Sequence, residues 1–367
     1  MGRWVSRQTP SRTFARTSLP VSDSSVDRLL SRETRLVSLV AVTLDPTVSV
    51  IVPVRNRREM LRDLLKALDN QSYDNFEVIV VDDGSTDGSE ELARDAVVRG
   101  KPVKVVESGG RGALPARQLG VEHSTSDILA FTDSDCVPDP GWLEHAVAAM
   151  VDGAEMVNGY TKPARPLRPM ERSMASGTEG LYPTCNMFFR RDLYDRLGGF
   201  DAAAADRWRF RATAHARGTG FGEDTLLGWQ AVRSGADTRY VPEAVVEHQV
   251  FPPDPKEFIS RLTQVAAFPA MTKEIPELRR TLMRKRVFLG NHARVPVYLT
   301  ALALLLRRRG LAALAVGWWV SLHVRRYQES PYPLAEQLPW LPVDMATDVM
   351  MAGALVAGSV SAREVVL

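Results

Sequence analysis

The chain has 367 residues, of which 45% are hydrophobic and 25% are charged, and its formal net charge is +2. This length and composition are ordinary for a globular protein with a real core, and they exclude a minimal binding module. The two cysteines, Cys136 and Cys185, fit neither a disulfide framework nor a metal cluster, so we expect a reducing compartment.

Residues 1–44 are rich in Ser, Thr and Arg and show no apolar stripe. We expect them to form a disordered N-terminal extension. Acidic residues are scarce at the start of the chain, which suits a transit peptide, but an over-extended start codon explains this extension at least as well. The apolar core of a secretory signal peptide is not present in this sequence.

From Val48 onward, short apolar runs alternate with helical patterns. Buried strands are predicted for residues 48–54, 76–81, 103–106 and 128–131. Helices are predicted between them, the second reaching about residue 99, with others around 116–123 and over 141–150. This alternation predicts a parallel, doubly wound α/β sheet that binds its ligand at the carboxyl ends of the strands.

Polar residues follow three of these strands. Asp133 and Asp135 come after the run 128–131, and side-chain alternation would point both carboxylates to one side, where they suit a divalent cation and its phosphates. Residues 82–85 end the second strand, and residues 53–56 end the first. The alternatives are an acidic turn for the first pair and a helix-capping turn for residues 82–85. Because polar residues follow three successive strands, a ligand-binding site is favoured over three unrelated turns.

The ordered motifs of the chain resemble those of family 2 glycosyltransferases over roughly residues 48–250. They are VSVIVPVRN (48–56), VVDDGSTD (80–87), ARQLG (116–120), FTDSD (131–135), CNMFFRR (185–191), GGFD (198–201) and GEDTLLGW (222–229). The resemblance implies a GT-A fold with a mixed, Rossmann-like sheet over residues 45–252. It also implies a nucleotide-sugar donor, Mn²⁺ or Mg²⁺, and inversion at the anomeric carbon.

The donor-side residues are implied by matching positions. Pro53 falls where backbone atoms meet the nucleobase, with Arg55 beside it, and Asp83 falls where the base is hydrogen-bonded, commonly uracil, so UDP is the favoured nucleotide. Arg117 is similar to residues near the donor, although Gln118 stands where Asn is usual, and an exposed helix arginine is the alternative. Asp133 would face the ribose, with Ser134 next to it.

The metal and the base are also implied by position. Asp135 would bind the cation that bridges the diphosphate and supplies its counter-charge. His248 either completes this metal site or is a structural histidine. Asp224 matches the catalytic base and Glu223 a residue that supports the loop or the acceptor; the alternative is that both are acidic residues favoured in the first turn of a helix.

Trp229 resembles an aromatic residue on the acceptor side of relatives, and a core position is the alternative. The chain reads Trp229-Gln-Ala-Val-Arg233, so it lacks the Gln-x-x-Arg-Trp motif of processive synthases. This absence favours the transfer of one sugar per encounter.

Residues 253–367 are expected to form a helical, basic and apolar region. Residues 279–326 contain eleven Lys or Arg and no acidic residue, so the rest of the chain carries a net charge of −9. The apolar runs 297–306 and 311–324 are separated by Arg307-Arg308-Arg309-Gly310, and each is shorter than the roughly 20 residues of a spanning helix.

Such segments suit an interfacial helical hairpin on an anionic membrane, which the apolar stretch 349–360 would join. We therefore expect a cytoplasmic protein, peripheral on the inner face of the cell membrane, and a hydroxyl acceptor that is a glycan, a lipid-linked saccharide or a small molecule. The alternative is a soluble helical subdomain.

Three other functions remain open. A nucleic-acid-binding protein would use the basic arm, but no nucleic-acid motif accompanies the arm, so we expect no nucleic-acid partner. A non-catalytic scaffold is disfavoured by the presence of Asp83, Asp135 and Asp224 together. A nucleotidyltransferase would have a similar sheet and would also use carboxylates to bind a metal ion. However, the glycine cluster 109–112 matches no dinucleotide or phosphate-loop fingerprint.

Overall fold

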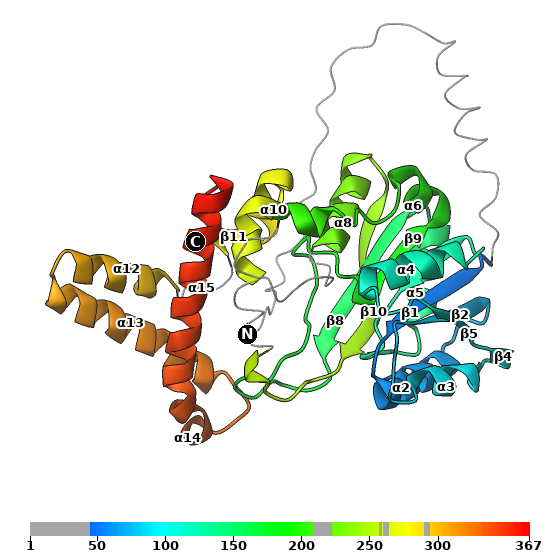
Figure 1. The fold of residues 1–367 in the computed structure, drawn as a ribbon, viewed down its shortest axis with the longest axis horizontal. Helices are drawn as coiled ribbons and strands as arrows, with labels where there is room; N and C mark the ends of the chain where they lie inside the picture. The colour runs from blue at the N-terminus through cyan, green and yellow to red at the C-terminus, as the bar shows by residue number, and fades with distance from the viewer. Residues whose placement is uncertain (1–44, 209–221, 257–258, 260–263, 290–293) are drawn as a thin grey trace, which may run out of the picture.

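The computed structural model describes residues 45–208, 222–256, 259, 264–289 and 294–367. The predicted N-terminal extension therefore lies outside the described residues. Within them, the chain forms an eight-stranded sheet covered by helices on both faces, followed by a helical C-terminal region (Figure 1).

The strand order is β5-β2-β1-β6-β9-β8-β10-β7. The first four in this order are parallel, as predicted; they are β5 (Lys104–Glu107), β2 (Phe76–Asp82), β1 (Val48–Val54) and β6 (Ile128–Phe131). The strand β9 (Met187–Arg190) runs antiparallel to both β6 and β8 (Met156–Pro163). The sheet is therefore mixed, as the resemblance to family 2 glycosyltransferases implied; the alternation of strands and helices had predicted its parallel part only. No helix connects β8 to β9 to make a parallel crossover.

The far edge of the sheet brings distant segments together. The long strand β10 (Thr238–His248) pairs in parallel with β8 and antiparallel with β7 (Cys136–Pro138). Its register shifts between Val241 and Val245, so the end of β10 is offset from its start.

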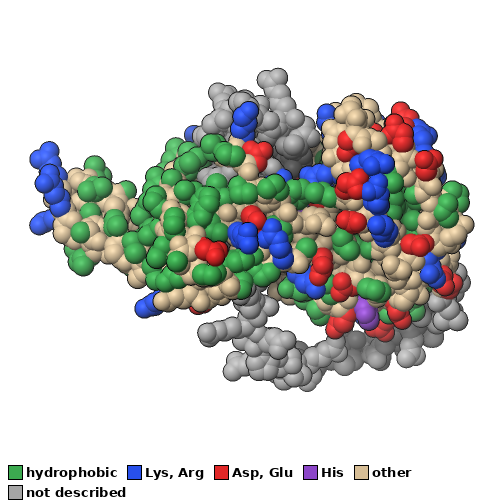
Figure 2. Space-filling view, turned by 90° about the horizontal axis from the view of Figure 1, so that it is seen from below, with side chains coloured by type: hydrophobic (Ala, Val, Ile, Leu, Met, Phe, Trp, Pro, Cys, Tyr) green, Lys and Arg blue, Asp and Glu red, His purple; other side chains and the backbone are tan. Residues whose placement is uncertain are grey.

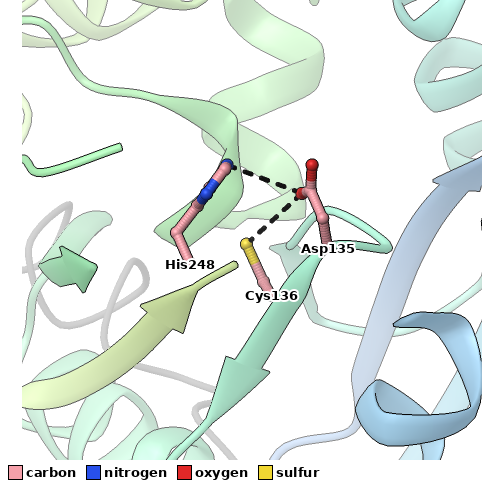
Figure 3. A group of neighbouring side chains, drawn as sticks. All are labelled: Asp135, Cys136 and His248. Carbon is pink, nitrogen blue, oxygen red and sulfur yellow. Dashed lines mark hydrogen bonds and ion pairs between the residues drawn. The ribbon is translucent and has the colours of Figure 1, made fainter. Parts of the chain in front are cut away.

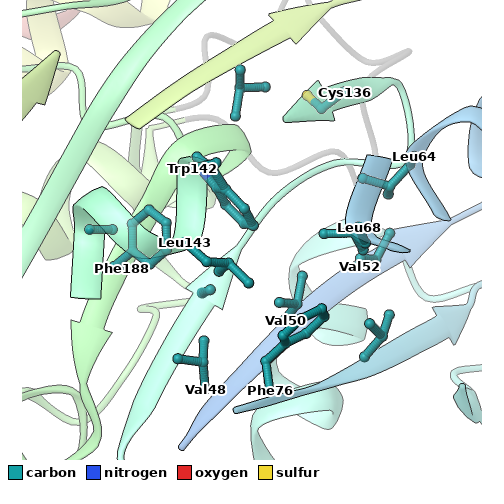
Figure 4. Close-up of a cluster of buried hydrophobic side chains, with 14 of the residues drawn as sticks. Val48, Val50, Val52, Leu64, Leu68, Phe76, Cys136, Trp142, Leu143 and Phe188 are labelled. Atoms are coloured by element: carbon teal, nitrogen blue, oxygen red, sulfur yellow. The ribbon is translucent and has the colours of Figure 1, made fainter. Parts of the chain in front are cut away.

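Alternating side chains of the central strand face two separate cores. Val48, Val50 and Val52 pack against α2 (Arg58–Asp69) and α5 (Trp142–Val151), as Figure 4 shows in part. On the other face, Ile51 packs in a cluster with residues of α4 (Ala113–Glu122), α6 (Arg191–Leu197) and α8 (Glu223–Arg233). A strand buried on both faces reads as a continuous apolar run, which is why it was visible in the sequence.

The second helix is shorter than predicted. It spans only Ser89–Arg94 (α3), and a small hairpin of β3 (Val97–Val98) and β4 (Lys101–Pro102) follows. The turn of this hairpin is Arg99-Gly100, with φ of 50° and 72°. Two consecutive positive φ values match a tight hairpin turn and end the helix before residue 99.

The C-terminal region is helical, as expected. The 3₁₀ segment η2 (Val265–Ala267) leads into α10 (Phe268–Glu274) and α11 (Leu278–Thr281), then a short hairpin of β11 (Met283–Arg284) and β12 (Phe288–Leu289). The remaining elements are α12 (Arg294–Leu305), α13 (Arg309–Gln328), α14 (Leu334–Gln337), η3 (Leu338–Trp340) and α15 (Leu341–Ala362). The pair α12–α13 projects away from the sheet (Figure 1).

The apolar stretch 349–360 lies within a longer helical segment than its sequence indicated. Residues 334–362 are long and apolar enough to cross a membrane by length and composition, and only 17% of their most apolar window is buried inside the protein. A single such segment is weak evidence of a membrane span.

A buried asparagine joins one helix and two strands next to the start of β9. Asn186, in the 3₁₀ turn η1 (Thr184–Asn186), accepts a hydrogen bond from the Trp142 indole at 2.8 Å. Its amide nitrogen donates to the carbonyls of Tyr160 at 3.1 Å and Ala244 at 2.9 Å. Asn186 thus ties α5, β8 and β10 to the strand that starts next to it.

We predict that Asn186→Ala lowers the free energy of unfolding by about 2–4 kcal/mol. The change leaves the Trp142 N–H and the Ala244 carbonyl unpaired in a buried place, and each such group costs about 1–3 kcal/mol. Denaturant unfolding measures the effect, with Asn75→Ala at the surface as the control. A loss no larger than the control's would contradict this role.

Candidate active site

Asp133 and Asp135 lie in the loop that follows β6, not on the strand itself. Because β6 ends at Phe131, side-chain alternation along a strand does not extend to them, and each carboxylate has a different arginine partner. Asp133 pairs with the buried Arg117 of α4 through its Oδ1. Asp135 instead accepts a hydrogen bond from Arg57 Nη1 at 3.0 Å. Ser134 between them is buried.

Asp135 and His248 come together because β7 pairs with the end of β10. In this pairing Cys136 lies opposite His248, and the Gln249 N–H donates to the Asp135 carbonyl at 2.9 Å. His248 Nε2 lies 3.6 Å from Asp135 Oδ1, and Cys136 Sγ lies 3.9 Å from the same oxygen (Figure 3). All three candidate ligand atoms are within 4.8 Å of one another.

The histidine is oriented by contacts on its other nitrogen. His248 Nδ1 lies 2.9 Å from the Gln249 carbonyl and 3.2 Å from Ser173 Oγ. A hydrogen bond from Nδ1–H to a carbonyl fixes the orientation of the ring, so that Nε2 faces Asp135. His248 thus lies within reach of a cation bound to Asp135, and the same contacts also fit a structural histidine.

The atoms present fit a divalent cation of the Mn²⁺ type. A carboxylate oxygen and an imidazole nitrogen suit Mn²⁺, whereas Mg²⁺ prefers oxygen ligands throughout. Cys136 is buried, and burial together with its contact with Cys185 raises the pKa of its thiol well above the ordinary value. A protonated, soft thiol is a poor ligand for a hard cation, so the fitting pair is Asp135 and His248.

The two carboxylates that end β2 have different surroundings. Asp82 Oδ2 accepts from the backbone N–H groups of Gly84 and Ser85 at 3.0 and 2.9 Å, so it stabilises the turn. Asp83 accepts from Ser108 Oγ at 2.5 Å and from the Gly112 N–H at 2.9 Å. The capping alternative thus belongs to Asp82, and Asp83 faces the segment leading into α4.

Two further residues that the sequence predicted for the donor side lie near Asp83. The Asp83 N–H donates to the Val54 carbonyl at 2.8 Å, next to the buried Pro53. Arg55 is exposed, and its Nη1 lies 3.7 Å from Asp83 Oδ2. The ends of β1 and β2 therefore bring Pro53, Arg55 and Asp83 to one place, as the sequence predicted for the sheet edge.

Asp224 occupies the first turn of α8. Its Oδ1 accepts from the Thr225 N–H at 2.7 Å, and its Oδ2 accepts from the Thr184 N–H at 3.3 Å. Burial and the charge of neighbouring Glu223 raise the pKa of Asp224 to about 7. A carboxylate with such a pKa can accept a proton near neutral pH.

Glu223 is the more buried member of this acidic pair. Its Oε2 has no hydrogen-bond partner among the described residues, and burial raises its pKa. The guanidinium of Arg117 favours the ionised carboxylates and therefore partly lowers the raised pKa values of both Glu223 and Asp224. Arg117 therefore links Asp133 of the loop after β6 with the acidic start of α8, and it is buried, unlike the exposed arginine of the alternative.

Trp229 is part of the core. Its indole N–H donates to the Gly180 carbonyl at 2.9 Å, and its ring packs edge-on against Tyr182 at 5.7 Å between centroids. The side chain lies in the cluster between α8 and the C-terminal helices. The position of Trp229 fits the core alternative, and its indole stabilises the segment around residue 180 through this hydrogen bond.

Sequence reasoning missed two groups at this site. Arg57 contacts Asp135, and Ser173 contacts His248, yet neither carries a family motif or a periodic pattern. The only signal for Arg57 was its place directly after the first strand's polar end. Ser173 gave none, because its partner is 75 residues away in the chain.

Comparison with known proteins identifies the family. Residues 49–198 match the family model described as Glycosyl transferase family 2. This part of the chain belongs to that family. It is 31% identical over 200 residues to glycosyltransferase AglE of Haloferax volcanii, and the match covers 49% of this chain and 66% of AglE.

Another relative is the pre-mycofactocin glycosyltransferase of Mycobacterium tuberculosis, with 30% identity over 220 residues, which cover 55% of this chain and 42% of that protein. The chain thus spans only part of the length of these relatives. Among solved structures, mannosyltransferase PcManGT from Pyrobaculum calidifontis, in complex with GDP-Man and Mn²⁺, is similar over 91% of this chain and 94% of that chain, with a TM-score of 0.53 and 20% identity. The likeness confirms the expected GT-A fold.

Proposed function

We propose that this protein is a metal-dependent, inverting glycosyltransferase that moves one sugar from a nucleotide-sugar donor to a hydroxyl acceptor. The observation that carries the proposal is Asp224, a carboxylate with its pKa raised to about 7 in a chain of glycosyl transferase family 2. The GDP-Man and Mn²⁺ bound to PcManGT are in line with a nucleotide sugar and a metal, although they are ligands of that protein.

Asp224 would act as the general base. As the acceptor oxygen forms its bond to the anomeric carbon, the hydroxyl proton passes to Asp224, and the bond between that carbon and the phosphate oxygen breaks. The electron pair leaves with the nucleoside diphosphate. Attack from the side opposite the leaving group inverts the anomeric configuration, as with the base of an inverting glycosidase.

The donor would be bound at the ends of β1, β2 and β6. Asp83 would hydrogen-bond the base, with the backbone at Pro53 and the guanidinium of Arg55 beside it. Asp133, held by Arg117, would face the ribose, with Ser134 in the same loop. A divalent cation bound by Asp135 and His248 would neutralise the charge that develops on the leaving diphosphate.

Two alternatives differ in a testable way. A nucleotidyltransferase of similar fold would release pyrophosphate from a nucleoside triphosphate, and a non-catalytic scaffold would bind a nucleotide sugar without turnover. The buried acidic pair Glu223 and Asp224 favours the sugar transferase, because neither alternative needs a base with a raised pKa there.

We further propose that the C-terminal helices bind an anionic membrane, which makes a lipid-linked acceptor the favoured class. Large apolar side chains of this region are exposed; the most exposed are Leu305 at 79%, Val360 at 75% and Leu314 at 72%. Arg307 and Arg308, between α12 and α13, and Arg309, the first residue of α13, are also exposed. Figure 2 shows hydrophobic side chains gathered over this part of the molecule.

The shape of this surface suits an interfacial position. The helix α12 has 12 residues and is about 18 Å long, too short for a hydrocarbon core of about 30 Å. Apolar side chains next to a cluster of arginines are typical of helices that lie at the interface of an anionic bilayer. Soluble proteins rarely leave so many adjacent leucines exposed.

We predict that purified protein with Mn²⁺ hydrolyses one class within a panel of UDP-, GDP- and dTDP-sugars, and that Asp135→Ala slows this by at least about 100-fold. Loss of the cation removes several kcal/mol of charge stabilisation. Cys136→Ser is the matched control and should keep near wild-type rates, since its thiol is not a ligand. Full activity of Asp135→Ala in the presence of a chelator would exclude the metal role, and turnover of nucleoside triphosphates alone would favour the nucleotidyltransferase.

We predict that Asp224→Asn keeps donor binding but lowers transfer about 10²- to 10⁴-fold, the usual contribution of a general base. In the wild type, kcat/KM should rise with pH through about 7, because the ionised carboxylate is the active form. Glu223→Gln removes the neighbouring negative charge, so the pKa of Asp224 should fall and the profile should move to lower pH. Turnover of Asp224→Asn like that of the wild type would place the base elsewhere.

We predict that the full chain sediments with phosphatidylglycerol vesicles in the absence of detergent, and less with phosphatidylcholine. Each of Arg307, Arg308 and Arg309 changed to Gln should weaken anionic binding by about fivefold, from about 1 kcal/mol per charge near the surface. Leu305→Ser with Leu314→Ser should weaken binding to both lipids, and Arg62→Gln on the catalytic domain should change neither. An absence of binding to anionic vesicles would favour the soluble subdomain.

A further inference from the structure

Arg57 lies directly against the proposed metal ligand. Its Nη1 donates to Asp135 Oδ2 at 3.0 Å, while Asp135 Oδ1 faces His248 Nε2 at 3.6 Å. The side chain of Asp135 is 15% exposed and that of Arg57 is 29% exposed, so solvent reaches both partners of this ion pair. One oxygen of Asp135 is thus occupied by a cationic side chain of the protein itself.

The guanidinium of Arg57 is held by its flat face. Its Cζ lies 4.4 Å from the centroid of the Phe251 ring, and Nη1 lies 3.3 Å from Met60 Sδ. Phe251 is buried and fixed by a backbone bridge to Arg172, with hydrogen bonds of 2.8 and 3.3 Å. An aromatic face attracts a guanidinium without using its N–H donors. Among the described residues, the side-chain hydrogen bonds of Arg57 use Nη1 alone, which leaves Nε and Nη2 for another acceptor.

We propose that Arg57 alternates between Asp135 and the diphosphate of the donor, an inference that rests on the proposed function. In the donor-free protein Arg57 neutralises Asp135 and competes with the divalent cation for it. When a nucleoside diphosphate arrives with the cation, the guanidinium is repelled from the metal-bound carboxylate and donates to phosphate oxygens instead. Phe251 keeps it within reach of both partners.

This exchange has a consequence that a purely structural arginine lacks. Removing Arg57 should strengthen the binding of the metal alone, because the competitor is gone, and should weaken the binding of nucleotide with metal, because a phosphate contact is lost. The two effects have opposite signs. Arg57 would therefore couple metal and nucleotide binding positively, by favouring the cation only when the diphosphate is there to accept the guanidinium.

The first measurement is the affinity of nucleotide-free protein for Mn²⁺, from the electron paramagnetic resonance signal of the free ion. Arg57→Met should tighten this affinity about two- to fivefold, the factor that corresponds to a partly exposed ion pair. The second is the binding of UDP and of GDP in saturating Mn²⁺, by calorimetry. The diphosphate that the wild type binds should bind Arg57→Met at least about tenfold more weakly, as for the loss of a hydrogen bond between charged groups.

Two further variants separate charge from shape. Arg57→Lys keeps the positive charge but loses the planar fork, so it should retain the competition for Asp135 and recover only part of the nucleotide affinity. Arg62→Met removes a positive charge from α2, the helix that begins directly after Arg57; Arg62 pairs with Glu59, and the change should alter neither affinity. Thermal melts like that of the wild type show that each variant is folded.

The inference is overturned when Arg57→Met leaves the Mn²⁺ affinity unchanged or weaker, or leaves nucleotide binding unchanged. Mn²⁺ binding that does not respond to Arg57 counts against this inference alone. Failure of both wild type and Arg57→Met to bind Mn²⁺ counts against the metal site of the proposed function as well.

Discussion

The antiparallel pairing of β7 with the end of β10 is the constraint on which the site depends. β7 has only three residues, yet it places Cys136 opposite His248 and connects the loop of Asp135 to the last strand of the sheet. Without this pairing, two residues more than a hundred positions apart in the chain would have no fixed separation. β10 also pairs with β8 along its other edge, both before and after the register shift, so it joins β7 to the rest of the sheet.

A second feature is that arginines pair with some of the neighbouring carboxylates of the candidate site. Arg117 pairs with Asp133 and also acts on Glu223 and Asp224, while Arg57 pairs with Asp135. Carboxylates this close would otherwise raise one another's pKa and leave some of them protonated. Arg117 counteracts this rise at Asp224, although burial and the charge of Glu223 still raise the pKa of Asp224 to about 7. The proposed base thus lies in surroundings that differ from those of the two carboxylates paired with arginines.

The sequence predicted the strands that are buried on both faces and the polar residues that follow them. It was right about β1, β2 and β6 because a doubly buried strand must be a continuous apolar run. It gave no direction for β9, since a short apolar strand has the same pattern whether it runs parallel or antiparallel. It also extended the second helix through Arg99, because the hairpin turn at Arg99-Gly100 depends on backbone angles that composition does not reveal.

Within the candidate site, the order of the motifs pointed to Asp83, Asp135 and Asp224, but it could not predict contacts between segments that are distant in the chain. The separate roles of Asp82 and Asp83 appear only when the partners Gly84, Ser85 and Gly112 are in place. Arg57 and Ser173 act through residues 78 and 75 positions away. Such pairs follow from the register of the whole sheet, which no local pattern encodes.

The segment between β8 and β9 connects this site to the C-terminal helices. Ser173 contacts His248, and Arg172 bridges to Phe251, which in turn stacks on Arg57. On the other side, Tyr332, just after α13, donates to the Pro166 carbonyl at 2.8 Å, and Arg168 stacks on the Tyr332 ring at 5.3 Å. One segment therefore contacts both the residues around Asp135 and the loop that follows α13. The C-terminal helices are thus joined to the sheet domain next to the candidate site as well as through the chain itself.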